Sequence, residues 1–332
     1  MNYKVYLTSS GKAKKLRKVT TPSIVVIEPE DFTKKEIEAL KGKGYKVLGY
    51  LSVGSISDER PYFNALKKYT LKKLEDWPHE WYLDLRRTAV RDFCVDRAKQ
   101  IKLLGCDGWW LDNVDVYEEY ESSATYNAVI SVLRRIKGLG GYVMVNGGSK
   151  FLQDKMDGES HLALYKVQCG AYSVYDNAEG LVSTLSKHNI KATIKIEDAG
   201  NGKLLNKVQC GAFSDFGNAY TMLCAVKNLG ISAFIKLSGT NKEEVDAKDF
   251  IDGVTQEEVF TLITNYSGKG KFSNQEGKQS EWYKEHMCRL KVHSIDTFLL
   301  EYSDDPKMVT KIKSFVNKFG LTGYYVSSDV NL

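Results

Sequence analysis

KVQCGAYS, at residues 166–173, recurs as KVQCGAFS at residues 207–214, an interval of 41 residues from Lys166 to Lys207. The register persists, because IKATI at 190–194 matches ISAFI at 231–235. Each copy has the pattern of a strand, a helix with apolar residues at helical spacing, and a second strand. Two such βαβ units predict a four-stranded antiparallel sheet with two helices on one face, the ferredoxin-like arrangement.

The sequence on either side of this repeat alternates short β-rich runs with helix-length segments, which is typical of parallel βα units. Helices are predicted over residues 34–43, 89–104, 125–137 and 306–319. Strands are predicted over residues 24–28, 47–53, 81–83, 109–111, 142–145, 250–254, 297–300 and 324–326. Eight βα units in about 250 residues match a (β/α)8 TIM barrel. We therefore expect an α/β fold in which the barrel is interrupted after strand 5 by an α+β ferredoxin-like domain.

The expected domains are a discontinuous barrel over residues 1–158 and 241–332 and the repeat domain over residues 160–239. A module whose two ends lie close together can occupy a surface loop without breaking the barrel. About 80 residues can bury a small core, so we expect the module to fold independently.

Composition excludes several classes of protein. The 332 residues are 42% hydrophobic and carry a net charge of +5, as expected for a folded globular protein. No block of Lys and Arg is dense enough for a nucleic-acid partner. No apolar run reaches the ~18 residues of a membrane span, and the start, MNYKVYLTSSGKAKK, lacks the apolar region of a secretory signal. We expect a protein that is either intracellular as made or supplied without its leader.

The six cysteines, at positions 94, 106, 169, 210, 224 and 288, have no spacing typical of a zinc site. We expect them to be buried and reduced, with a Cys169–Cys210 pairing as the alternative. The glycine-rich stretches 138–141 and 268–271 have neither P-loop nor dinucleotide spacing. No metal site and no cofactor are predicted.

Polar side chains recur where the predicted barrel strands end, and TIM-barrel enzymes place their chemistry at these ends. They include Glu28, Asp31, Ser52, Ser55, Asp84, Asp112, Asn113, Asp115, Asn146, Gln256, Glu257, Glu258, Glu301, Ser327 and Asp329. Aromatic residues lie close by in sequence, at Tyr50, Trp81, Trp109, Trp110, Tyr117, Tyr302, Tyr324 and Tyr325. Like charges in one cleft repel, so a purely structural barrel has no reason to gather them. Carboxylates among aromatic faces are typical of carbohydrate sites, where two carboxyl groups share the catalysis.

The flanking segments resemble glycoside hydrolase family 114, the endo-α-1,4-polygalactosaminidase-like barrels. The motifs that carry the resemblance are LGYLSVG at 48–54, EWYLD at 80–84, GCDGWWLDNVD at 105–115, VMVNG at 143–147, GVTQEEVF at 253–260 and LEY at 300–302. One departure follows the second predicted strand, where GSIS at 54–57 stands in place of the Gly-Glu-Ala-Glu of many relatives. The carboxylate of that pattern is therefore missing at this position.

The resemblance implies a catalytic nucleophile at Asp112 and an acid/base at Glu257. Asp112 should stay ionised among polar donors, whereas Glu257 needs a raised pKa to protonate the leaving oxygen. Carboxyl groups about 5–5.5 Å apart would give retention, and about 6.5–9.5 Å would give inversion. Asp115 and Glu258 are the rival acids. The expected substrate-binding residues are Tyr50, Asp84, Trp110, Asp115, Asn146, Glu258, Glu301 and Tyr302.

The middle repeat resembles the SPOR family, small modules that bind bacterial peptidoglycan glycan strands. The motifs are YKVQCGAY at 165–172, VQCGAF at 208–213 and AFIK at 233–236. Alternate residues on the exposed sheet face should bind glycan, although either strand phase could form the core. The candidates are Gln168, Ser173, Gln209 and Ser214.

Together the two resemblances imply a glycoside hydrolase that cleaves an amino-sugar polysaccharide with retention and is held on peptidoglycan by the inserted module. The alternative is a non-catalytic wall-binding protein with an inactive barrel, which the missing carboxylate supports. An extracellular or wall-associated location is expected, reached through a trimmed leader or release by lysis.

Overall fold

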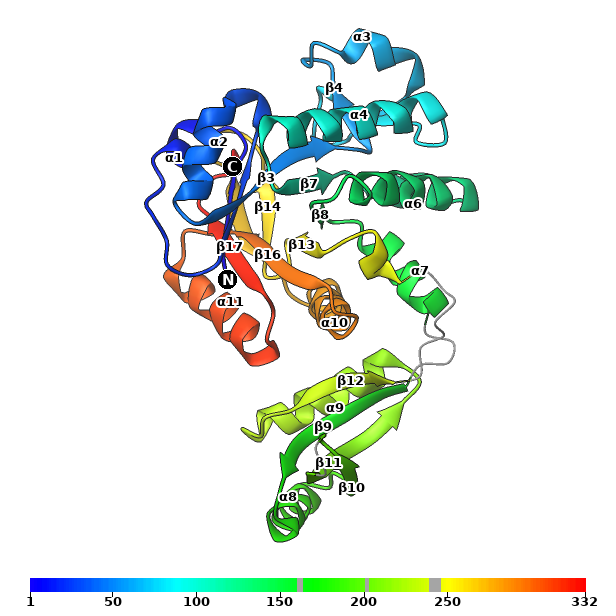
Figure 1. The fold of residues 1–332 in the computed structure, drawn as a ribbon, viewed down its shortest axis with the longest axis vertical. Coiled ribbons are helices and arrows are strands. Elements are labelled where there is room, and N and C mark those ends of the chain that lie inside the picture. Colours follow the sequence, from blue (N-terminus) through cyan, green and yellow to red (C-terminus); the bar gives the residue numbers. More distant parts are fainter. Residues whose placement is uncertain (160–163, 201–202, 239–245) are drawn as a thin grey trace. The chain divides into compact units, whose positions relative to one another are not determined.

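The computed structural model describes residues 1–159, 164–200, 203–238 and 246–332. The chain divides into two compact units, one of Met1–Lys155 with Asp246–Leu332 and one of Met156–Val245 (Figure 1). The expected domain boundaries at 160, 239 and 241 lie outside the described residues.

The first unit is a closed barrel of eight parallel strands. In spatial order they are β1 (Asn2–Tyr6), β17 (Gly323–Ser327), β16 (Asp296–Tyr302), β13 (Gly253–Glu257), β8 (Tyr142–Asn146), β7 (Gly108–Asp112), β3 (Tyr45–Ser52) and β2 (Ser23–Ile27). Runs such as SIVVI in β2 are buried at every position, as expected for a parallel sheet that is covered on both faces. Five barrel strands precede the second unit in the chain, and three follow it.

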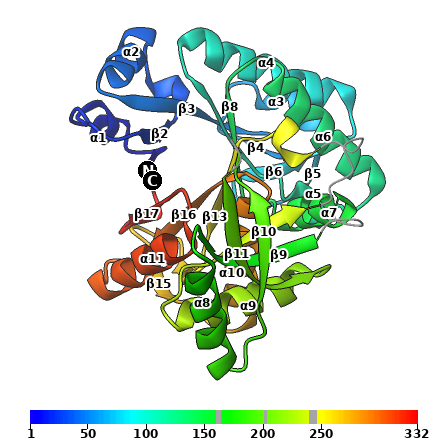
Figure 2. The same ribbon diagram turned by 60° about the horizontal axis from the view of Figure 1, so that its bottom comes forward.

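Helices cover the outside of the barrel (Figure 2). They are α1 (Ser10–Lys14), α2 (Lys34–Gly42), α4 (Thr88–Leu104), α6 (Ser123–Lys137), α7 (Ser149–Glu159), α10 (Lys278–Val292) and α11 (Pro306–Phe319), with the short α3 (Phe63–Leu66) and α5 (Val116–Glu119) in loops. The four predicted helices are confirmed as α2, α4, α6 and α11. Local signals set their ends: α11 begins after the capping Asp305 with Pro306 in its first turn, and it ends at Gly320 in the left-handed region.

One predicted barrel strand is wrong and one was missed. Residues 81–83 lie in β6 (Glu80–Leu83), the middle strand of a small antiparallel sheet with β4 (Ser55–Ser57) and β5 (Thr70–Lys73). The missing barrel strand is β1, which pairs in register with all of β2 and reaches β17 through Asn2 and Tyr324. The sixth predicted strand, 250–254, is displaced, since β13 begins at Gly253 and ends at Glu257.

The barrel interior is packed with aromatic and aliphatic side chains around a small polar cluster. Trp110 Nε1 donates to Tyr3 Oη at 2.7 Å, and Tyr3 Oη lies 2.9 Å from Thr255 Oγ1. These buried groups satisfy one another, so β1, β7 and β13 are tied together below the carboxyl ends of the strands. A further hairpin, β14 (Thr261–Asn265) with β15 (Lys271–Asn274), follows β13.

The second unit is a four-stranded antiparallel sheet in the order β10 (Thr193–Asp198), β11 (Leu204–Phe213), β9 (Leu164–Tyr172) and β12 (Phe234–Ser238). Helices α8 (Tyr175–Lys187) and α9 (Phe216–Asn228) pack on it. Val167 and Val208 are fully buried, so their strand phase forms the core beneath the helices. This order is the expected ferredoxin-like arrangement.

None of the six described cysteines is joined in a disulfide bond; five are buried as expected, and Cys224 is partly exposed. Cys169 and Cys210 lie on neighbouring strands with their Sγ atoms 2.9 Å apart. No helix within the described residues is long and apolar enough to cross a membrane.

Candidate active site

A cavity of about 760 Å³ opens at the carboxyl ends of the barrel strands. The last residues of four strands line it: Asp112 of β7, Asn146 of β8, Glu257 of β13 and Tyr302 of β16. The fold therefore brings together four of the predicted site residues that are far apart in the sequence. The cavity volume is within the range of small-molecule sites, about 300–1,000 Å³.

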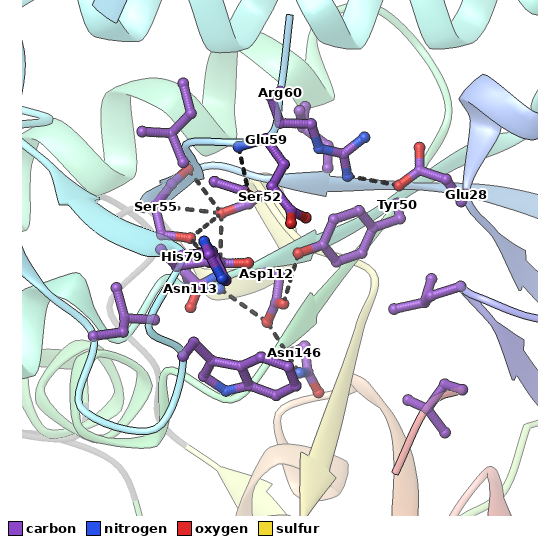
Figure 3. Close-up of a pocket in the computed structure, with 18 of the residues that line it drawn as sticks. Glu28, Tyr50, Ser52, Ser55, Glu59, Arg60, His79, Asp112, Asn113 and Asn146 are labelled. Atoms are coloured by element: carbon purple, nitrogen blue, oxygen red, sulfur yellow. Dashed lines mark hydrogen bonds and ion pairs between the residues drawn. The ribbon is translucent and has the colours of Figure 1, made fainter. Parts of the chain in front are cut away.

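Asp112 is held by three donors from three elements. Tyr50 Oη donates to Oδ2 at 3.1 Å, and Asn146 Nδ2 and the Asn113 backbone N each donate to Oδ1 at 3.0 Å. Figure 3 shows the Tyr50 hydroxyl and the Asn146 amide meeting Asp112 from different sides. Burial raises the pKa of Asp112, and the three hydrogen bonds oppose that rise because they stabilise the carboxylate.

Asn146 joins the two acids. Its Nδ2 donates to Asp112 Oδ1 at 3.0 Å and to Glu257 Oε1 at 2.7 Å. These two oxygens can therefore be no farther apart than the sum of the two distances, 5.7 Å. Asn146 itself is buried, and its Oδ1 has no hydrogen-bond partner among the residues that the structure describes.

Glu257 is poised to carry a proton near neutral pH. Burial raises its pKa to about 7, and the charges of Asp112 and Glu258 act in the same direction. The Tyr302 hydroxyl donates to Oε2 at 2.7 Å and, with Asn146, lowers the pKa by stabilising the carboxylate. Three donors stabilise the carboxylate of Asp112, and two stabilise that of Glu257. Two carboxyl groups in different surroundings can divide the roles of acid and of base or nucleophile between them.

The turn that follows Asp112 has an unusual backbone conformation. Asn113 has a φ of 60°, in the left-handed region that few non-glycine residues adopt. A Cβ on Gly54 would lie 1.7 Å from the Asn113 carbonyl oxygen, so only glycine fits there. Asn113 Nδ2 also donates to Ser52 Oγ at 3.0 Å, which ties the turn after β7 to the end of β3.

A carboxylate from another strand lies beside the serine that follows the second predicted strand. Ser55 Oγ donates to Glu80 Oε2 at 2.5 Å. Glu80 begins β6, lines the cavity, and has a pKa raised by burial and by the charge of Asp112. Glu80 is not among the predicted site residues, because its motif EWYLD was expected in a barrel strand and lies in β6 instead.

The cavity rim carries aromatic side chains that are not among the predicted site residues. Trp77, 47% exposed, and Tyr266 meet edge to face with ring centroids 5.4 Å apart, and both line the cavity. On the other side, Arg60 pairs with Glu28 at 2.7 Å and with Glu30 at 3.0 Å. The pairing of Arg60 with Glu28 is visible in Figure 3. Aromatics in long loops carry no periodic signal, so the sequence alone could not assign them.

The predictions that Glu301 and Asp84 bind substrate are wrong, because both side chains are buried and accept hydrogen bonds from groups of the protein itself. Glu301 is fully buried and accepts from the backbone N–H groups of Val259, Phe260 and Thr261 and from Thr261 Oγ1. Asp84 is buried and accepts from Arg86 Nε at 2.6 Å and Arg87 Nε at 3.0 Å. Neither is among the described residues that line the cavity.

The remaining predicted site residues differ in whether they line the cavity. Tyr50, Trp110 and Glu258 line it, with Trp110 almost fully buried in the barrel core. Glu258 accepts from the Ile263 backbone N at 2.6 Å. Asp115 is not among the described lining residues, although burial raises its pKa to about 7. Among the two rival acids, Glu258 therefore faces the cavity and Asp115 does not.

In the second unit, Gln168 and Gln209 pair with each other across β9 and β11. The two glutamines occupy the strand phase opposite to that of the buried Val167 and Val208. The valines therefore form the core of the sheet, and the glutamines lie on its outer face. Ser173 and Ser214 lie in the bends after these strands, since β9 ends at Tyr172 and β11 at Phe213. The prediction that these two serines stand on the sheet is wrong.

Within the described residues, no group of three or more His, Cys, Asp or Glu side chains could hold a metal ion.

Comparison with known proteins gives family matches for both units. Residues 2–156 match the model of glycoside hydrolase family GH114, and residues 163–241 match the model of the SPOR domain. No curated protein matches the chain.

Solved structures with the same fold include two barrels. The glycoside hydrolase domain of PelA from Pseudomonas aeruginosa is 12% identical, with 100% of this chain and 96% of that chain covered and a TM-score of 0.59. Aspergillus fumigatus Ega3, in complex with galactosamine, is 15% identical, with coverages of 100% and 92% and a TM-score of 0.53. The peptidoglycan binding domain of the B. subtilis cell wall lytic enzyme CwlC is 38% identical over 23% of this chain and 91% of that chain, with a TM-score of 0.21.

These matches agree with a barrel whose cavity holds two hydrogen-bonded acids at the strand ends. Residues 2–156 belong to glycoside hydrolase family GH114 and residues 163–241 to the SPOR family, so this chain is a glycoside hydrolase that carries a SPOR domain.

Proposed function

We propose that the barrel hydrolyses an amino-sugar polysaccharide with retention of anomeric configuration, with Asp112 as nucleophile and Glu257 as acid/base. The observation that carries this proposal is the bridge by Asn146 Nδ2, which limits the nearest oxygens of the two acids to 5.7 Å. Retaining glycosidases have carboxyl groups about 5–5.5 Å apart, whereas inverting ones need about 6.5–9.5 Å to admit a water.

In the proposed mechanism, Glu257 protonates the glycosidic oxygen while an Asp112 oxygen attacks the anomeric carbon. Tyr50, Asn113 and Asn146 hold Asp112 as a carboxylate. Glu257, deprotonated after the first step, then removes a proton from the water that releases the sugar from Asp112. Tyr302 and Asn146 stabilise that carboxylate by donating to it.

Two features support an amino sugar as the substrate. The cavity wall carries seven carboxyl groups against two guanidinium groups: Glu28, Glu30, Glu59, Glu80, Asp112, Glu257 and Glu258 against Arg60 and Arg97. A cleft with this excess of negatively charged groups favours a cationic ligand. The barrel of Ega3, which has the same fold, was solved with galactosamine.

The test is product release from a galactosamine polymer and from peptidoglycan stripped of stem peptides. We expect Asp112→Asn and Glu257→Gln each to reduce kcat by at least 10³-fold, since each removes a group that acts in both chemical steps. Asp96→Asn, on the exposed face of α4, is the matched control and should retain full activity. Intact polymers with the wild-type protein would favour the inactive wall-binding barrel instead.

Stereochemistry is tested separately. The first product seen by proton NMR should have the same anomeric configuration as the substrate. Azide should restore turnover to Glu257→Ala by attacking the glycosyl-enzyme, and the product should be a glycosyl azide of retained configuration. An inverted first product would contradict the roles assigned to Asp112 and Glu257.

We further propose that the SPOR domain, over residues 160–239, is inserted after the fifth barrel strand and tethers the enzyme to peptidoglycan glycan strands. The barrel would comprise residues 1–158 and 241–332. Support comes from the chain order of the barrel strands and from the outer sheet face, where Gln168 and Gln209 pair. A tether raises the effective concentration of a wall-bound polysaccharide without new catalytic contacts. Such a protein would act outside the membrane, at the cell wall.

Sedimentation of the full chain with stripped peptidoglycan tests the tether. Gln168→Ala combined with Gln209→Ala should reduce the bound fraction, because both side chains stand on the outer face. The control is Ser183→Ala combined with Ser186→Ala on α8, which packs on the other face. Ser173→Ala combined with Ser214→Ala measures whether contact extends to the bends after the strands. Equal binding by the glutamine variant and the control would contradict the proposed face.

A further inference from the structure

One face of the four-stranded sheet in the SPOR domain is not covered by the two helices of that domain. Helices α8 and α9 pack on the face that carries the buried valines of β9 and β11. On the opposite face, Gln168 pairs with Phe234 of β12 and with Gln209 of β11. Gln209 pairs in turn with Thr193 of β10. These four uncharged side chains form a central row across β12, β9, β11 and β10, the strands that lie side by side in Figure 1.

Two pairs of lysines flank the central row. Lys166 and Lys236 are direct partners on β9 and β12, two residues from the row on one side. Lys195 and Lys207 are direct partners on β10 and β11, two residues from the row on the other side. Residues two apart along a strand point to the same face, so all four, the outer lysines, stand on the uncovered face. The sequence repeat relates the two pairs, since Lys207 and Lys236 follow Lys166 and Lys195 by 41 residues.

The net positive charge of the domain lies on this face. Residues 164–238 contain eight lysines, five acidic residues and no arginine. Four of the lysines and one of the acids, Glu197, stand on the uncovered face, so the charges elsewhere in the domain balance. Glu197 pairs with Lys207 at 2.6 Å, and the other three outer lysines form no ion pair within the described part of the chain. A single carboxylate therefore faces four ammonium groups.

Each lysine pair places two like charges directly opposite each other on neighbouring strands. Like charges in this position destabilise a sheet, because the two side chains stand close together and repel. The unfavourable arrangement occurs twice, at equivalent positions of the two repeats. An anionic group that binds between the two ammonium groups of a pair offsets their repulsion. Both pairs are thus suited to an anionic ligand.

The geometry and the residue type indicate the class of this ligand. The two pairs lie about four residues apart along the strands, roughly 13 Å, so a ligand that reaches both carries separated negative charges, as a polymer does. Arginine is the residue that pairs bidentately with planar carboxylates, whereas lysine acts as a point charge that also suits phosphate oxygens. A face with lysine and no arginine therefore favours a flexible chain of phosphodiester groups.

From these contacts we propose that the outer lysines bind a phosphodiester polymer of the cell wall, in addition to the glycan strands. The inference goes beyond the proposed function, because it gives the SPOR domain a second ligand that is recognised by charge. Only the cell wall as the source of the polymer rests on the proposed function. The central row carries no charge and remains available to the glycan, so the two kinds of binding can be separated by mutation.

The experiment measures calorimetrically the affinity of the full chain for soluble poly(glycerol phosphate), in wild-type protein and in two variants of equal net charge. The outer-lysine variant combines Lys166→Gln, Lys195→Gln, Lys207→Gln and Lys236→Gln. The control variant replaces the other four lysines of the domain and combines Lys187→Gln, Lys191→Gln, Lys203→Gln and Lys227→Gln. The outer-lysine variant should bind about tenfold more weakly than wild type, because several exposed ion pairs are lost together, and the control should stay within about threefold. Equal affinities of the two variants, or no binding by wild type, would overturn the inference.

Thermal unfolding shows whether the outer-lysine variant is folded. Its SPOR domain should unfold at a higher temperature than that of wild type, because the repulsion within the two lysine pairs is removed. This result supports the cost assigned to the pairs. Unfolding at a lower temperature would contradict it.

Two other probes distinguish the sources of negative charge. Binding to peptidoglycan freed of both stem peptides and phosphodiesters should be equal in wild type and in the outer-lysine variant. Weaker binding of the variant there would assign the lysines to carboxylates of the glycan, which overturns the inference and leaves the proposed tether standing. Wild-type binding to phosphatidylglycerol vesicles as strong as to poly(glycerol phosphate) would assign the face to a membrane surface and also overturn it.

Discussion

Replacing Tyr302 by Phe should move the basic limb of the pH–rate profile to higher pH. The phenol donates to Glu257 Oε2 at 2.7 Å, and this bond stabilises the carboxylate. A hydrogen bond to a charged group contributes about 1.5–3 kcal/mol, and about 1.4 kcal/mol corresponds to one pH unit. Because Asn146 still donates to Glu257, we take the lower end and expect the pKa of Glu257 to rise by about one pH unit, from about 7.

The direction of the shift follows from the protonation state that Glu257 needs in the first chemical step. Glu257 must be protonated to assist departure of the leaving group, so activity falls as pH rises through its pKa. A higher pKa extends the active range upward. The assay is kcat/KM on a galactosamine oligomer from pH 4 to about pH 10, because kcat/KM reports groups of the free enzyme.

Tyr50→Phe is the matched control, because Tyr50 donates to Asp112 at 3.1 Å as Tyr302 does to Glu257. Asp112 must be ionised, and loss of this donor raises its pKa, so the acidic limb should move upward while the basic limb stays in place. Each of the two substitutions should therefore shift only one limb of the pH–rate profile. If Tyr302→Phe left the basic limb unchanged, or if both variants displaced the same limb, the assignment of acid and nucleophile would be refuted.

Three further predictions concern stability. Glu301→Gln turns an amide N–H₂ toward backbone donors and should lower the free energy of unfolding by about 3 kcal/mol in urea titrations; a change below about 0.5 kcal/mol would contradict the structural role given to this buried acid. Gly54→Ala places a Cβ 1.7 Å from the Asn113 carbonyl oxygen, so activity should be lost and thermal unfolding should occur earlier, whereas normal kinetics would show that the turn is not required. Mild oxidation should join Cys169 to Cys210 with loss of two titratable thiols and, for a loop of this length, about 4 kcal/mol of added stability in the SPOR domain. Two unreacted thiols after oxidation would contradict that geometry.

Much of the fold could be predicted because its signals are local. The repeat at Lys166 and Lys207 specifies one βαβ unit twice, and each copy contains its own strands and helix. Helices α4 and α11 end at Gly105 and Gly320, where left-handed glycines stop them. Asp112 and Glu257 could be proposed as partners because both end barrel strands, and in a closed parallel barrel all strand ends meet at one mouth.

The sequence by itself therefore determined the two modules, the strand-and-helix alternation and the acids at the mouth, since each depends on neighbours within a few residues. Tertiary structure decided which alternating segment entered the barrel. NYKVY did so by pairing with β2 and β17, and EWYL instead paired antiparallel with β4 and β5. It also decided that Glu301 serves the protein interior and that Glu80 faces the cavity. The reason is physical: burial, strand pairing and the pKa of an acid depend on groups distant in the chain, and no local pattern records them.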